Sequence, residues 1–104
     1  MAARSAFGGA RELGIMARER KRGAMQTIFI MVKCDLGKAY DVADEAVQAV
    51  EQVSEVYSTS GEYDLLIKCY LPEAADIGHF VTETVQTLPG VKDTFTIIAF
   101  KAFT

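Results

Sequence analysis

The chain has 104 residues, half of them hydrophobic, which is enough for one domain with a modest core but not for two. No apolar run approaches the roughly 18 residues that span a bilayer, so no membrane association is expected. Six basic and two acidic residues precede Met25, whereas five lysines and twelve acids follow it. Lys and Arg supply most non-specific affinity for phosphate backbones, so direct nucleic-acid binding by this acidic part is not expected.

Residues 1–24 are rich in Ala, Gly and Arg and have no sustained apolar period. Such a segment cannot bury enough apolar surface to offset its ordering entropy. We expect a basic, disordered tail, a tag or an extension upstream of a true start at Met25, followed by one domain over residues 25–104. A basic arm that touches nucleic acid or another subunit is the alternative. A transit peptide is disfavoured by Glu12 and Glu19.

From Met25 onward, four runs of strand-forming residues alternate with two segments of helical period. The pattern predicts strands at residues 27–34, 53–59, 64–71 and 91–103, and helices at residues 38–52 and 77–88. Strict alternation in the second strand places Val53, Glu55 and Tyr57 on one side. The order strand, helix, strand, strand, helix, strand is an α+β, ferredoxin-like βαββαβ arrangement. Right-handed crossovers then give a four-stranded antiparallel sheet of order 4-1-3-2, with both helices on one face.

The first and third predicted strands are apolar on both sides, but two helices on one face can cover only one of them. An exposed apolar patch of that size marks an interface. We therefore expect at least a homodimer that meets through its sheets.

The two cysteines, Cys34 and Cys69, lie in apolar runs and have no metal-ligand spacing. Cys34 ends the first strand, whereas Cys69 lies late in the third, antiparallel strand. Several residues of offset at about 3.3 Å each exceed the separation that a disulfide tolerates. We expect two buried free thiols, which fits a reducing cytoplasmic location.

No catalytic pattern is present: there is no P-loop, no CxxC and no nucleophile beside a base. His79, the single histidine, is expected on the surface of the second helix. The acids of the first helix have no calcium-loop spacing. The sequence therefore predicts no enzyme activity, no metal and no cofactor.

The turn between the second and third strands concentrates polar groups in a short space. Gly61 can adopt a positive φ and expose backbone N–H groups to a carboxylate, while Asp64 can pair with an ammonium group. Hydroxyl groups at the start of the last strand can complete a shell for an amino-acid zwitterion. The candidate residues are Ser60, Gly61, Glu62, Tyr63, Asp64, Thr94 and Thr96. The alternative is ordinary hairpin chemistry, with glycine for geometry and threonines because strands favour them.

Two motifs carry a resemblance to a known family. The hairpin at residues 55–66 reads EVYSTSGEYDLL, and residues 88–97 read LPGVKDTFTI. Together they resemble the Lrp/AsnC ligand-binding domain, also called RAM, over Gln26 to Thr104. The resemblance implies sheet-mediated dimers, assembly into rings that are commonly octameric, and amino acids bound in clefts between dimers. Ser60 replaces the usual threonine but keeps the hydroxyl group.

Full-length members of that family carry an N-terminal helix-turn-helix, which 24 Arg-rich residues cannot supply. The resemblance thus implies a stand-alone effector and oligomerisation module that binds a free amino acid and acts in transcriptional regulation of amino acid metabolism. Co-assembly with full-length relatives is a further hypothesis. Two alternatives stay open: an enzyme similar to the dimeric α/β-barrel monooxygenases, and a scaffold that only assembles.

Overall fold

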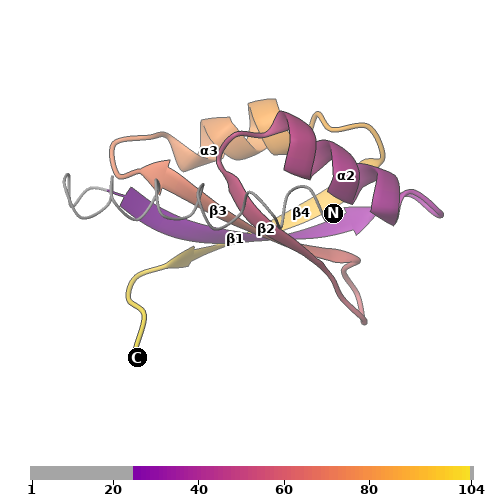
Figure 1. Cartoon of the computed structure of the whole chain (residues 1–104), viewed down its shortest axis with the longest axis horizontal. Coiled ribbons are helices and arrows are strands. Elements are labelled where there is room, and N and C mark those ends of the chain that lie inside the picture. The colour runs from indigo at the N-terminus through magenta and orange to yellow at the C-terminus, as the bar shows by residue number, and fades with distance from the viewer. Residues whose placement is uncertain (1–24, 104) are drawn as a thin grey trace.

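A computed structural model describes residues 25–103, so the expectations for residues 1–24 lie outside the described residues. The elements follow the predicted order (Figure 1). They are β1 Met25–Cys34, α2 Ala39–Ala49, β2 Val53–Ser58, β3 Leu65–Pro72, α3 Ile77–Phe80, a π-helical segment η1 Val81–Val85, and β4 Val91–Ala99.

The strands form one antiparallel sheet of order β2-β3-β1-β4, which confirms the predicted order 4-1-3-2. Both helical segments cover the same face of this sheet, and the other face is open (Figure 1). The predicted ferredoxin-like α+β architecture is therefore confirmed.

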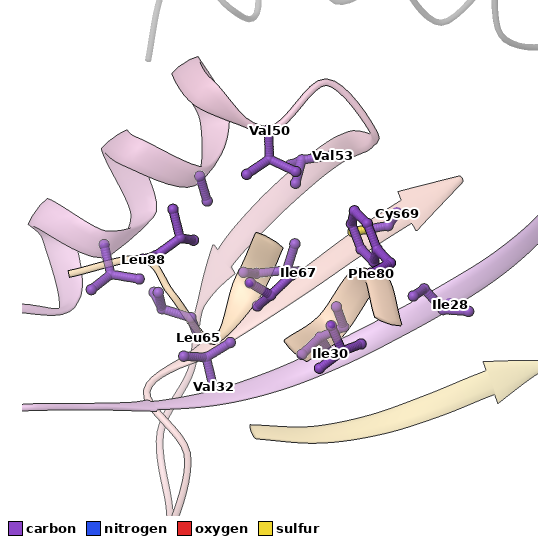
Figure 2. Packing of buried hydrophobic residues seen from close by; sticks show 14 of the residues in the cluster. Ile28, Ile30, Val32, Val50, Val53, Leu65, Ile67, Cys69, Phe80 and Leu88 are labelled. Carbon is purple, nitrogen blue, oxygen red and sulfur yellow. The ribbon is translucent and has the colours of Figure 1, made fainter. Parts of the chain in front are cut away.

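The core lies between the helices and the covered face of the sheet (Figure 2). Alternate residues of β1 point into it: Ile28, Ile30 and Val32 are fully buried, whereas the residues between them are only partly buried. Val42 and Ala46 of α2, one helical turn apart, pack against them. The continuous apolar run of β1 thus has two environments, one packed and one facing outward.

Both helices are shorter than predicted. α2 ends at Ala49 because Val50 takes an extended conformation that buries its side chain in the core. The second helix begins after Asp76, whose carboxylate accepts the His79 backbone N–H at 3.0 Å. It ends as η1, where the Gln86 N–H donates to the Val81 carbonyl five residues earlier, and Leu88 reaches the core from the following turn.

A β-bulge corrects the predicted facing of β2. The register with β3 shifts between Val53 and Glu55, so that Ser54 is the extra residue. Val53 is therefore fully buried on the helix side, whereas Glu55 and Tyr57 lie on the open side. The prediction that Val53 shares a face with Glu55 was wrong because strict alternation cannot cross a bulge.

The last strand also ends earlier than predicted, at Ala99 rather than Phe103. Ala99 is the last residue of β4 that pairs with β1, opposite Thr27. Beyond it the chain leaves the sheet on the side away from the helices (Figure 1). Phe100 and Phe103 are 95% and 86% exposed, so little within residues 25–103 packs against them.

Cys34 and Cys69 are buried and are not joined in a disulfide, as predicted. Cys69 pairs with Ile28, near the opposite end of β1 from Cys34. Burial raises the pKa of the Cys34 thiol, and the negative charges of Asp64 and Asp35 raise it further. Cys34 is thus held as a neutral thiol.

We expect both thiols to resist alkylation by iodoacetamide at pH 8, because the thiolate is the reactive form and burial blocks access. Labelling should rise at least tenfold when urea unfolds the chain. Mass spectrometry across a urea series measures this. Fast labelling of Cys34 in the folded protein would contradict its burial.

Candidate functional site

An open groove lies where the end of β1 meets the β2–β3 hairpin and the start of β4. Its volume is about 620 Å³. Its lining residues are 33–37 and Ala39, then Gly61, Glu62 and Asp64 in the hairpin, and Lys92 in β4. Three segments far apart in the sequence therefore converge on one depression, which we call the hairpin groove.

Asp64 joins the hairpin to β1. Its carboxylate Oδ2 accepts the Cys34 backbone N–H at 2.7 Å, and its own N–H donates to the Val32 carbonyl at 2.8 Å. Its carbonyl accepts the Thr59 N–H at 2.9 Å, which closes the hairpin. The Thr59 hydroxyl donates to the Tyr63 carbonyl at 2.9 Å. The carboxylate is thus held in a fixed position at the groove.

The hairpin turn has the geometry that the sequence predicts. Gly61 has φ +99°, in the region that favours glycine. Ser60 and the neighbouring Glu62 are exposed. This turn therefore leaves its polar groups accessible at the rim of the hairpin groove.

The loop that faces the hairpin is also held in place. The Asp35 N–H donates to the Gly90 carbonyl at 2.8 Å, and the Lys38 N–H donates to the Asp35 carbonyl at 3.0 Å. Between them Leu36 is fully exposed at the groove. Both walls of the hairpin groove are thus fixed by backbone hydrogen bonds.

The hairpin groove carries both signs of charge. Lys33 and Lys92 contribute ammonium groups, and Asp35, Glu62 and Asp64 contribute carboxylates. A zwitterion needs a cation for its carboxylate and an anion for its ammonium group. The residues that line the hairpin groove supply both.

The remaining predicted residues lie elsewhere. Tyr63 is half-buried, with its ring 6.3 Å from that of Phe95 between centroids. Thr94 pairs with Val32 and Thr96 pairs with Ile30, both in β1. The strand β1 therefore lies between the two threonines and the hairpin. Two strand spacings amount to about 10 Å.

Thr94 has its own partners: its hydroxyl accepts Gln86 Nε2 at 2.8 Å, and its N–H donates to Asp93 at 2.9 Å. The structure therefore brings Gly61, Glu62 and Asp64 together, but not the two threonines with them.

Sequence reasoning did not select Lys33, Lys92, Asp35 or Leu36. One signal was available: Lys33 is the one charged residue in the apolar run 27–34. Lys92 directly follows the LPGV turn at the start of the last strand, which the predicted antiparallel order already places beside the end of the first strand. Convergence of these residues is a product of the tertiary fold.

The open face of the sheet is a second surface of interest. Its central part is apolar, because Phe29 pairs with Ile97 and Met31 pairs with Phe95 across β1 and β4. Phe95 and Ile97 are 54% and 41% exposed. Large apolar side chains side by side in solvent are typical of an interface.

Towards β2 the open face becomes polar. Lys68 Nζ lies 5.2 Å from the centroid of the Tyr70 ring, and the Tyr57 hydroxyl donates to Glu55. The hydrogen bond with Tyr70 raises the pKa of Lys68, and the charges of Glu55 and Tyr57 raise it further, against an opposing effect of burial. The open face thus has an apolar part and a charged, hydrogen-bonded border.

The fold and the two surfaces define a small α+β domain of the ferredoxin-like class, with an apolar open face and a charged groove at its hairpin. Residues 27–104 match the Lrp/AsnC ligand binding domain family. The chain belongs to that family, as its two motifs predicted.

Two curated relatives are transcriptional regulators. The HTH-type transcriptional regulator FL11 of Pyrococcus abyssi is 33% identical over 79 residues, which are 76% of this chain and 51% of the relative. The leucine-responsive regulatory protein of Escherichia coli K12 is 32% identical over 77 residues, which are 71% of this chain and 46% of the relative. The chain spans about half the length of these curated relatives.

Among solved structures, a hypothetical protein from Pyrococcus horikoshii is 32% identical, with a TM-score of 0.65. The match covers 74% of this chain and 92% of that one. That solved chain therefore consists almost entirely of a domain similar to the present one.

Proposed function

We propose that the chain is an amino-acid-binding effector and oligomerisation module of transcriptional regulation. The observation that carries this is the fixed Asp64 carboxylate in a groove that also holds Lys33 and Lys92. Asp64 receives the ammonium group of the ligand, and a lysine with the exposed N–H groups near Gly61 receives the carboxylate.

The relatives support an amino acid as the ligand. The E. coli relative is by its name leucine-responsive, and both curated relatives are regulators. Leu36 and Ala39 add apolar surface to the hairpin groove, which suits an aliphatic side chain better than a charged one. Ser60 and Tyr63 flank Gly61 and Glu62 of this site in the sequence. Thr94 and Thr96 lie on β4, away from the hairpin groove. They can contact the same ligand only where the β4 strand of a second chain faces the hairpin groove.

The open face supports a homodimer as the unit of assembly. Burying Phe95 and Ile97 against the same residues of a second copy removes apolar surface from water on both chains. The dimer then assembles further into a ring of the octameric kind that the family resemblance implies. Co-assembly with full-length regulators uses the same surfaces.

An enzyme of the monooxygenase-like kind is disfavoured. Such enzymes need a roomy pocket between helices and sheet, whereas apolar side chains fill that space here (Figure 2). Within residues 25–103 no group of three or more His, Cys, Asp or Glu side chains is placed to hold a metal ion. The related proteins are regulators, which also favours a regulatory function over an enzymatic one.

None of the helices in residues 25–103 is long and apolar enough to cross a membrane.

Replacing Asp64 with asparagine tests the ligand site. The amide oxygen of asparagine can still accept the Cys34 N–H, so the hairpin stays closed while the negative charge is lost. A thermal-shift screen against the twenty amino acids should find a selective shift for the unmodified protein. Asp64→Asn should remove at least 90% of that shift.

Glu51→Gln is the matched control, since Glu51 is an exposed acid in the turn after α2. It should keep the full ligand-induced shift. Light scattering on each responding mixture then reports whether the ligand changes the assembly. A folded, oligomeric protein that responds to no amino acid would contradict the effector proposal and favour the scaffold alternative.

A further inference from the structure

Residues 100–103, which follow β4, carry two large aromatic side chains into solvent. Phe100 is 95% exposed and Phe103 is 86% exposed. Lys101 Nζ lies 5.3 Å from the centroid of the Phe103 ring. The segment 100–103, here called the C-terminal segment, leaves the sheet on the open side (Figure 1). Its aromatic side chains have no cover within residues 25–103 of the same chain.

A groove of about 700 Å³ lies beside this segment, at the end of the sheet opposite the hairpin groove. Its floor includes Thr27 and Phe29 of β1 and Lys68 and Tyr70 of β3. These residues alternate with core residues, so they lie on the open face. We call this depression the sheet-end groove.

The sheet-end groove matches the C-terminal segment in character. Phe29 and the Tyr70 ring offer apolar surface to a phenyl ring. Glu73 also lines the groove and offers a carboxylate to Lys101. Lys68, whose ammonium group lies over the Tyr70 ring, makes one side of the groove cationic. An aromatic side chain next to a cation is therefore complementary to Phe29 and the Glu73 side of the groove.

The chain's own segment does not fill this groove. Phe100, Lys101 and Ala102 border it, yet the Phe100 side chain stays almost fully exposed. The groove and the segment that suits it thus lie next to each other on one chain, both unoccupied by the other. A two-fold axis through the open face converts such a pair into two equal contacts, each segment lying in the groove of the other chain.

We propose that residues 100–103 exchange between the two copies of a homodimer, each C-terminal segment lying in the sheet-end groove of the other. This inference rests on the proposed homodimer but adds a contact that the open face alone does not require. Phe100 and Phe103 act as the anchors, and Lys101 pairs with Glu73 across the interface.

Cysteine cross-linking tests the exchange. Full chains carrying Phe103→Cys are mixed with full chains carrying Thr27→Cys and a size tag, and are then oxidised gently. A disulfide-linked pair of unequal chains is expected. Replacing Thr27→Cys by Glu83→Cys, an exposed position on the helix side, should give none. The native thiols are buried and give the background in the unmodified protein.

A second variant measures the energetic contribution. Phe100→Ser with Phe103→Ser alters only exposed side chains, so the chain should fold as before. The dimer dissociation constant should rise at least tenfold by analytical ultracentrifugation, because buried aromatic anchors dominate interfaces.

The outcomes separate this inference from the proposed homodimer. A dimer without the mixed cross-link, or with an unchanged dissociation constant in the double-serine variant, would overturn the exchange and leave the dimer intact. A third sample is a chain that carries both Thr27→Cys and Phe103→Cys. If its disulfide forms only within single chains, the C-terminal segment covers the groove of its own chain and the exchange is overturned. A monomer at all concentrations would overturn both proposals.

Discussion

Gly90→Ala is expected to lower the free energy of unfolding by about 2–5 kcal/mol, from backbone strain and overpacking together. Gly90 has φ +95°, where a side chain is strained. An added Cβ would also lie 2.9 Å from Val42 Cγ2 and 3.1 Å from Lys38 Cβ. Urea denaturation measures the change.

Gly61→Ala is the matched control for that substitution. Gly61 has nearly the same φ, +99°, but nothing lies within 4 Å of an added Cβ. Only the conformational term remains, about 1–2 kcal/mol. Equal losses of unfolding free energy at the two positions would show that the close approach of the added Cβ to Val42 of α2 makes no contribution.

Gly90→Ala also reaches the candidate site. The Gly90 carbonyl accepts the Asp35 N–H, which holds the loop that carries Leu36. Any shift at this turn moves one wall of the hairpin groove. We therefore expect ligand affinity, where the screen finds a ligand, to fall together with stability in Gly90→Ala.

The order and pairing of the elements could be predicted from the sequence because the two-residue alternation of strands and the 3.6-residue spacing of helices both arise from local backbone geometry. Alternation in β1 and the apolar face of α2 are repeated over many residues, so single exceptions do not hide them. The bulge at Ser54 and the π-helical end at Val85 each depend on one extra residue fitted to the packing of neighbouring elements. Nothing local in the sequence records that fit.

The candidate site was predictable only where it is contiguous. Gly61, Glu62 and Asp64 stand in one turn, and the turn chemistry identified them. The partner of the Asp64 carboxylate is a backbone N–H thirty residues away in the sequence, and Lys92 comes from another strand. The threonines were grouped with the hairpin because their hydroxyl groups suit a zwitterion, whereas the sheet places β1 between the hairpin and the strand that carries them.

The largest effect on assembly is expected from Ile97→Asp. Ile97 lies on the open face opposite Phe29, where the proposed homodimer buries it. A carboxylate there loses apolar contact and places like charges from two chains near the same two-fold axis. Each substituted chain should lose about 2 kcal/mol of binding free energy. With two such chains in a dimer, the dimer dissociation constant should rise about a thousandfold. Light scattering across a concentration series measures this.

Ile98→Asp is a closely matched control. Ile98 is the next residue of the same edge strand and is 44% exposed, against 41% for Ile97, but its side chain points to the helix side with its partner Ile28. Both substitutions carry the same charge and the same strand propensity. A dimer that survives Ile98→Asp and is lost in Ile97→Asp assigns the interface to the open face. Equal loss in both would mean that the effect comes from destabilisation of β4 or from the sheet-end groove, which Ile98 also lines, rather than from the centre of the open face.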